Sequence, residues 1–142
     1  MEKYKIILIL LVLSFSAPSF AENCDCPTQA KSVKDSYNQA GIVAVGTVQK
    51  FGKSPIRPGM NEAVIKLMSR YKGLENVKAN SLYVYTPDSK QKCGMNFLVS
   101  QDYLIYADGT AARPVAISCS RTDVLDNALG QLEELQKLGA KK

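Results

Sequence analysis

Apolar segments with strand-like patterns recur along the middle of the chain. Residues 42–48 are rich in valine and isoleucine, and β-branched side chains favour strands. Residues 62–71 alternate between apolar and polar positions, which is the period of a strand with one buried face. Three shorter apolar segments, at residues 81–86, 103–107 and 115–117, lie between polar or glycine-containing turns and complete five predicted strands.

Two segments with helical periodicity flank these strands. Residues 27–38 place apolar side chains on one face, with Thr28 where an N-cap residue is expected and a glycine after the end. In residues 123–138, leucine and alanine recur at heptad spacing and form one wide apolar stripe. Such a stripe either binds a partner or packs on the domain's own sheet, and we expect the second.

Glycine and proline mark the breaks between the strands. Residues 52–59 contain two glycines and two prolines and are predicted to be a loop, and residues 87–92 form a second, polar loop. Gly46, inside the first strand, predicts a bulge or a sharp bend. Five short strands between two helices are typical of a small barrel. We therefore predict a mainly β fold, a five-stranded Greek-key OB-fold barrel with flanking N-terminal and C-terminal helices.

The start of the chain has the pattern of a secretory signal. Two lysines precede an apolar run at residues 6–15, and Ser19 and Ala21 occupy the −3 and −1 positions of a signal-peptidase site. The run is shorter than the roughly 20 apolar residues of a membrane-spanning helix, so cleavage is favoured over an uncleaved anchor. We predict residues 1–21 as a signal peptide and residues 22–142 as one domain that is exported, periplasmic or extracellular, with no membrane span.

Composition and charge exclude several function classes. The chain has no histidine, so no Ser-His-Asp or Cys-His catalytic site can form within it. Without Lys3, Lys5 and Glu2 of the signal, the 18 basic and 13 acidic side chains become 16 and 12, a net charge of +4. These charges are scattered, which argues against nucleic acid and leaves an acidic glycan as one class of partner. We predict no enzyme, no cofactor and no metal ion bound by the chain alone.

The cysteines predict disulfides. There are four of them: Cys24, Cys26, Cys93 and Cys119. An even number in an exported domain indicates disulfide bonds, and the oxidising compartment and the C-x-C spacing disfavour a four-cysteine metal site. A bond within C-x-C would close a very small ring, which leaves two long-range pairings. Each long-range bond stabilises the domain by about 4–5 kcal/mol in the chain-entropy account.

Several short motifs occur in an order that is similar to one known family. In sequence they are Cys24-Asp25-Cys26-Pro27, Val45-Gly46-Thr47-Val48, Tyr71-Lys72-Gly73, Cys93-Gly94, Tyr103-Leu104-Ile105-Tyr106-Ala107 and Cys119-Ser120-Arg121-Thr122. In this order the chain resembles the tissue inhibitors of metalloproteinases and the wider netrin-like domain family. The resemblance covers essentially the whole predicted mature chain.

The resemblance carries expectations about fold and disulfides. It implies an OB-fold barrel with flanking helices. It also implies that Cys24 pairs with Cys93 and that Cys26 pairs with Cys119, which is one of the two long-range pairings left open above. Netrin-like domains also serve as binding modules in larger proteins, so we predict a disulfide-stapled binding module with an unidentified protein partner.

The resemblance also implies an alternative function, the inhibition of a zinc metalloendopeptidase. In the inhibitors, the free amine and the carbonyl oxygen of the first cysteine chelate the zinc of the protease, and the residue between the cysteines enters the neighbouring pocket. Carried over, Cys24 is the chelating residue and Asp25 the pocket residue of the Cys24-Asp25-Cys26 edge. The predicted cleavage leaves Glu22 and Asn23 ahead of Cys24, so chelation requires a trimmed chain.

For the binding module, we expect the partner surface where loops meet the N-terminal edge. Loops carry recognition on a rigid scaffold. The candidate residues are Pro27, Ile56, Arg57, Pro87 and Asp88. Ile56 is the most conspicuous apolar residue of its loop, and the alternative is that it folds back on the barrel.

Overall fold

One five-stranded antiparallel sheet forms the centre of the molecule in a computed structural model, which describes residues 24–27 and 31–139. The strands are β1 (Ile42–Lys53), β2 (Met60–Lys72), β3 (Ser81–Pro87), β4 (Asp102–Ala107) and β5 (Asp123–Val124). Their order is β3-β2-β1-β4-β5, and every neighbouring pair is antiparallel. The prediction of a mainly β fold is confirmed, and the sheet is open, with β3 and β5 at its edges.

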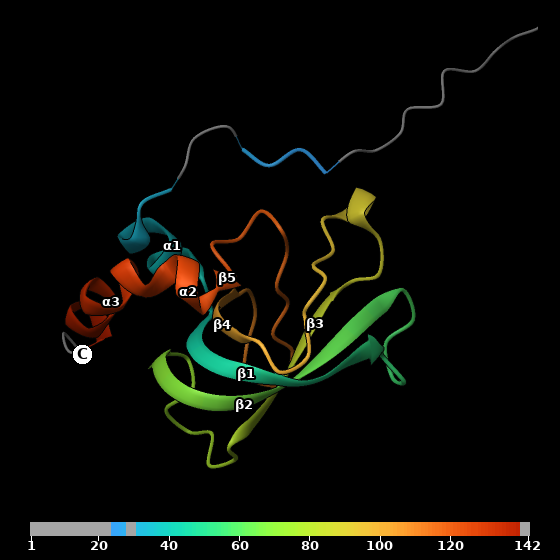
Figure 1. The fold of residues 1–142 in the computed structure, drawn as a ribbon, viewed down its shortest axis with the longest axis horizontal. Coiled ribbons are helices and arrows are strands. Elements are labelled where there is room, and N and C mark those ends of the chain that lie inside the picture. Colours follow the sequence, from blue (N-terminus) through green and yellow to red (C-terminus); the bar gives the residue numbers. More distant parts are fainter. Residues whose placement is uncertain (1–23, 28–30, 140–142) are drawn as a thin grey trace, which may run out of the picture.

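Within the described residues, five short helices accompany the sheet. They are α1 (Val33–Gln39), η1 (Lys90–Lys92), α2 (Leu125–Ala128), η2 (Leu129–Gln131) and α3 (Leu132–Gly139). Figure 1 shows α1, α2 and α3 gathered at one side, while η1 and the turn between β1 and β2 lie at the other. Within the described ranges, no helix is long and apolar enough to cross a membrane. The predicted signal peptide, residues 1–21, lies outside the described residues.

Strand β1 is longer than its apolar pattern indicated. It continues through Lys53 and pairs with β2 there, so the loop predicted over 52–59 is shortened to residues 54–59. The bulge predicted at Gly46 is present as a shift of register directly before this residue. A Cβ atom at Gly46 would lie 2.4 Å from the Cγ2 atom of Ile65, so only glycine allows the two strands to approach this closely.

The sheet separates two hydrophobic clusters, one on each face. Ile42 and Ala44 of β1 belong to the first cluster, and Val43 and Val45 belong to the second. Successive side chains of a strand point to opposite faces. Both faces of this part of β1 are therefore buried, which is why its sequence is an unbroken apolar run instead of an alternating one.

The N-terminal helix begins later than predicted. Residues 31 and 32 are not helical, and α1 starts at Val33. Its N-cap is Ser32, whose hydroxyl accepts a hydrogen bond from the backbone N–H of Asp35 at 3.0 Å. The Asp35 carboxylate in the first turn complements the positive end of the helix. Thr28, the predicted cap, lies outside the described residues.

The single C-terminal helix predicted over 123–138 is wrong. Asp123 and Val124 pair with β4 as strand β5, and the helical segment that follows is divided into α2, η2 and α3. The division falls around Gly130, and glycine is a poor residue for a helix interior. The expected packing is confirmed, because Ala128 and Leu135 are buried in the second cluster, on the domain's own sheet.

The predicted strand at 115–117 is also wrong. Val115 makes only isolated bridges, a parallel one with Tyr85 and an antiparallel one with Asp108. Pro114 precedes it and has no backbone N–H to donate to a ladder. The segment is nevertheless held to the edge of β3, because Tyr85 N–H donates to the Pro114 carbonyl at 2.9 Å and Ala116 N–H donates to the Tyr85 carbonyl at 2.9 Å.

Candidate functional site

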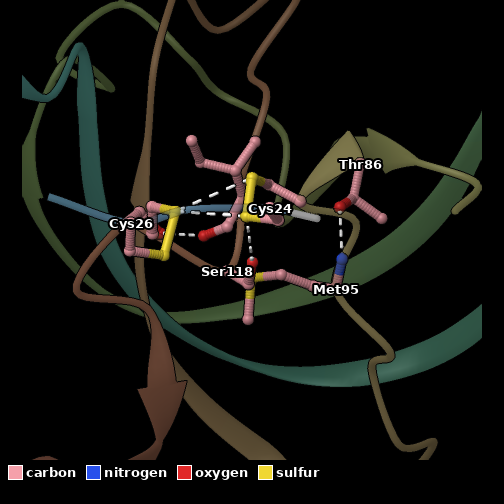
Figure 2. Close-up of a disulfide and its surroundings, with 9 residues drawn as sticks. Cys24, Cys26, Thr86, Met95 and Ser118 are labelled. Carbon is pink, nitrogen blue, oxygen red and sulfur yellow. Dashed lines mark hydrogen bonds between the residues drawn. A yellow bond between two sulfur atoms is a disulfide. The ribbon is translucent and has the colours of Figure 1, made fainter. Parts of the chain in front are cut away.

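Two disulfides lie side by side near the start of the described chain. Cys24 is bonded to Cys93, and Cys26 is bonded to Cys119, which is the pairing that the family resemblance implies. Figure 2 shows the two bonds together, with the Cys24 and Cys119 sulfur atoms 3.3 Å apart and the Ser118 hydroxyl 3.5 Å from Cys24 Sγ. No cysteine is free. The sulfur cluster of Cys24, Cys93 and Cys119 is therefore occupied by covalent bonds and offers no thiolate for a metal ion.

The local backbone explains why Cys93 reaches this position. Cys93 has a left-handed conformation, with φ of 63°, at the end of η1. At Gly94 a Cβ atom would lie only 2.0 Å from the Pro87 carbonyl oxygen, so the chain can turn back here only with glycine. The next N–H, of Met95, donates at 2.8 Å to the hydroxyl of Thr86, which is fully buried (Figure 2).

The disulfides hold the predicted N-terminal edge at the surface. Asp25 and Pro27 are exposed, and Asp25 stands between the two bonded cysteines. In Figure 1 this short blue segment passes between the helices and η1. We call residues 24–27 the N-terminal ridge, an exposed segment that is covalently fixed to two distant parts of the chain.

The two predicted loops lie against each other. The backbone N–H of Asp88 donates to the Gly59 carbonyl at 3.1 Å, and the Lys53 ammonium lies 3.4 Å from the Asp88 carboxylate. Pro87 pairs with Met60 across the two strands. The structure therefore brings Pro87 and Asp88 next to the loop of Ile56 and Arg57, as the proposed surface requires.

Within the loop 54–59, Ile56 and Arg57 point to different surroundings. The Ser54 hydroxyl accepts hydrogen bonds from the backbone N–H groups of Ile56 and Arg57, at 3.4 and 3.2 Å, which fixes the loop. The Ile56 side chain is 71% exposed, so it does not fold back on the sheet. The Arg57 guanidinium instead lies over the ring of Tyr85, 4.1 Å from the ring centre.

A pocket of about 550 Å³ opens beside this loop. Its lining includes Ile56, Arg57, Pro58, Tyr85, Ala112 and Arg113. Sequence reasoning missed the last three residues. Tyr85 approaches the loop because β3 pairs with β2, where it stands opposite Glu62. Ala112 and Arg113 approach it because the segment around Val115 is bridged to the edge of β3, and no local pattern signals that contact.

Burial and charge also affect Tyr85 in this pocket. Tyr85 is 5% exposed. Its burial, the larger cause, and the negative charge of Glu62, the smaller one, raise the pKa of the Tyr85 hydroxyl above its ordinary value. The Tyr85 hydroxyl thus lies close to an acidic group. The Glu62 carboxylate also lies 3.5 Å from the Ser54 hydroxyl.

A smaller pocket, of about 180 Å³, adjoins the second loop. Pro87, Asp88, Lys90 and Asn61 are among its lining residues. We call residues 54–59, 87–93 and 109–113 the loop end, together with residues 24–27, which the Cys24–Cys93 bond holds to the second loop.

Comparison of the chain with protein-family models found no match, and comparison with curated proteins found none either. Function is therefore inferred from the chain's own residues and their arrangement. The relevant features are the disulfide-fixed ridge, the exposed isoleucine and the two pockets of the loop end.

Proposed function

We propose that this chain is an exported binding module that recognises a protein partner through its loop end. The observation that carries the proposal is the exposure of Ile56, a large apolar side chain that is 71% exposed on a loop fixed by hydrogen bonds. An apolar side chain held in water gains free energy when a partner covers it. The two disulfides suit an oxidising, exported compartment.

The rigidity of the loop end supports a role in recognition. The Cys24–Cys93 and Cys26–Cys119 bonds fix the N-terminal ridge, and the contacts of Asp88 with Gly59 and Lys53 fix the two loops to each other. A surface that is already ordered loses little conformational entropy on binding. The loop end therefore combines an apolar anchor with a preorganised frame.

We further propose the finer fold, a Greek-key OB-fold barrel of the netrin-like type. Its support is the pair of bridges at Val115, which connect the edge strand β3 with the turn after β4. An experimental structure that places residues 108–116 between β3 and β4 as a continuous ladder would establish the closed barrel.

The binding proposal is tested by changing Ile56 alone. Proteins of the native extracellular or periplasmic fraction are captured on the immobilised wild type, on Ile56→Ser and on Leu129→Ser. Leu129 is the matched control, because it is 55% exposed but lies in η2, on the helical side of the molecule (Figure 1). A partner retained by the wild type and by Leu129→Ser but lost by Ile56→Ser is the expected result.

Melting temperature provides the structural check. Because Ile56 is exposed, Ile56→Ser should melt within a few degrees of the wild type. Equal capture by all three proteins would contradict the proposal, and so would a large loss of stability in Ile56→Ser with capture intact.

A second candidate function, inhibition of a zinc metalloendopeptidase, is favoured by the exposure of Asp25 between two disulfides. A rigid exposed ridge is a suitable shape for entering a protease cleft. A neutral amine and a carbonyl oxygen of Cys24 would form a five-membered chelate on the zinc and displace its water. This mechanism requires a chain that begins at Cys24.

A further inference from the structure

The pocket beside Ile56 combines apolar and cationic groups. Ile56 and Pro58 line it from the β1–β2 loop, Arg57 and Arg113 bring two guanidinium groups, and Tyr85 is its buried member. Ile56, Arg57, Pro58, Tyr85 and Arg113 are called the arginine pocket below. Its volume of about 550 Å³ is large enough for one or two side chains of a partner.

The two arginines are not neutralised within the described part of the chain. Neither Arg57 nor Arg113 forms an ion pair with a described residue. Arg57 is oriented by the Tyr85 ring, which attracts the cation but leaves the N–H donors of the guanidinium edge available. Glu62, an acidic group close to Tyr85, lies 3.5 Å from the Ser54 hydroxyl and forms no ion pair with either arginine among the described residues.

The loops around the pocket carry a net positive charge, as the two arginines do. Residues 52–59, 87–92 and 108–113 carry five basic and two acidic side chains. One of the acidic groups, Asp88, is already paired with Lys53. The field around the pocket therefore attracts anionic partners and repels cationic ones.

We infer that the arginine pocket binds an acidic side chain of an extended partner polypeptide, with a neighbouring apolar side chain of that partner against Ile56 and Pro58. The inference rests on the proposed function and names the partner's chemistry. A planar guanidinium matches a carboxylate with two parallel hydrogen bonds. An acidic polysaccharide would use the charges but leave Ile56 uncovered, so the exposed isoleucine favours a polypeptide.

The probe is a display library of random short peptides, selected on the immobilised full-length protein. We expect the enriched peptides to carry aspartate or glutamate beside leucine, isoleucine or phenylalanine. The affinity of one enriched peptide is then measured by fluorescence anisotropy for the wild type, Arg57→Gln/Arg113→Gln and Arg113→Gln. Loss of a charge-assisted pair should weaken binding by about tenfold or more.

The matched control is Lys34→Gln/Lys66→Gln, which removes two exposed charges from α1 and β2, outside the loop end and outside the pocket. It should bind within about threefold of the wild type, as expected for exposed charges outside the contact. Arg113 is exposed, so Arg113→Gln keeps the test decisive if the double variant, which also loses the contact with Tyr85, fails to fold.

The outcomes separate the inference from the proposed function. Enrichment of uncharged apolar peptides whose binding requires Ile56 would overturn the inference of an acidic partner and leave the proposed binding module intact. Acidic peptides that bind the double arginine variant as tightly as the wild type would overturn the pocket assignment. Binding of a sulfated oligosaccharide that is lost in Lys90→Gln/Lys92→Gln, with no peptide enriched, would overturn both.

Discussion

The Sγ atom of Cys24 lies 3.3 Å from the Sγ atom of Cys119, although the two cysteines belong to different disulfides. The Cys93 Sγ atom is 3.7 Å from the same Cys119 atom. At such separations a thiolate on one cysteine is placed to attack the other disulfide, which exchanges the bond and releases a new thiolate. The four cysteines are therefore chemically coupled.

This coupling predicts the behaviour of a Cys26→Ser variant. The freed Cys119 thiolate should attack Cys24, form a Cys24–Cys119 bond and release Cys93 as a thiol. Peptide mapping without reductant should find this bond together with the original Cys24–Cys93 bond. The control, Cys26→Ser/Cys119→Ser, should contain Cys24–Cys93 alone. A Cys26→Ser protein whose Cys119 remains entirely free would contradict the prediction.

Gly94 should tolerate no side chain. In Gly94→Ala the Cβ atom would lie 2.0 Å from the Pro87 carbonyl oxygen, so the backbone must shift beside the Cys93 disulfide. We expect the free energy of unfolding to fall by about 3 kcal/mol, measured by urea denaturation. Gly130→Ala is the control, because nothing lies within 4 Å of its Cβ, and it should be neutral or stabilising by about 0.5–1 kcal/mol. Equal stability of the two variants would contradict the packing at Gly94.

Tyr106 should make the domain less stable at high pH. Burial raises the pKa of its hydroxyl to about 12, and the hydroxyl donates to Gln131 at 2.9 Å. Below about pH 10 both the folded and the unfolded chain keep the proton. Between about pH 10 and 12 the unfolded chain loses the proton first, so ionisation favours unfolding. The free energy of unfolding should fall by about 2 kcal/mol over this range.

The measurement is chemical denaturation of the wild type and Tyr106→Phe across this pH range. The variant loses the hydrogen bond to Gln131 and starts less stable, but its stability should fall less steeply with pH. Identical pH slopes for Tyr106→Phe and the wild type would show that Tyr106 does not contribute.

The inhibitor candidate predicts a strict dependence on the N-terminus. Protein beginning at Glu22 should inhibit zinc endopeptidases weakly or not at all, because the Cys24 nitrogen is then an amide and a poor zinc ligand. Protein made to begin at Cys24 should inhibit better. Asp25→Thr in this form should improve inhibition further, because it removes a charge that the protease pocket would bury.

Acetylation provides the control for this prediction. Blocking the amine of the form that begins at Cys24 should abolish the gain in inhibition. Tight inhibition by the form that begins at Glu22 would show that chelation by Cys24 is not the mechanism. Absence of inhibition in every form would leave the binding module as the function.

Four strands were predictable because their patterns are local. The segments 42–48, 62–71, 81–86 and 103–107 all lie within observed strands, since short runs of β-branched and aromatic residues, alternating or unbroken, mark strands that bury one or both faces. The segments 115–117 and 123–138 were predicted wrongly because their secondary structure depends on contacts with residues far away in the sequence. Val115 meets Tyr85, and Asp123 meets Leu104, only in the folded state.

For the site, the sequence by itself determined the residue types that are available. It supplied four cysteines for disulfides, excluded histidine chemistry, and placed an isoleucine between prolines in a glycine-bounded loop. The residues alone left two long-range pairings of the cysteines, and they could not decide whether Ile56 is exposed. The number of cysteines, the lack of histidine and the sequence of the loop are properties of composition and of short-range pattern, which the chain has before it folds.

Only the tertiary structure decided the arrangement of these groups. It put Cys24 beside Cys93 and Cys26 beside Cys119, turned Ile56 to solvent, and brought Arg113 to the pocket of Arg57. The physical reason is that each contact joins segments far apart in the chain. Such contacts depend on the register of the strands between them, and a local pattern does not contain that register.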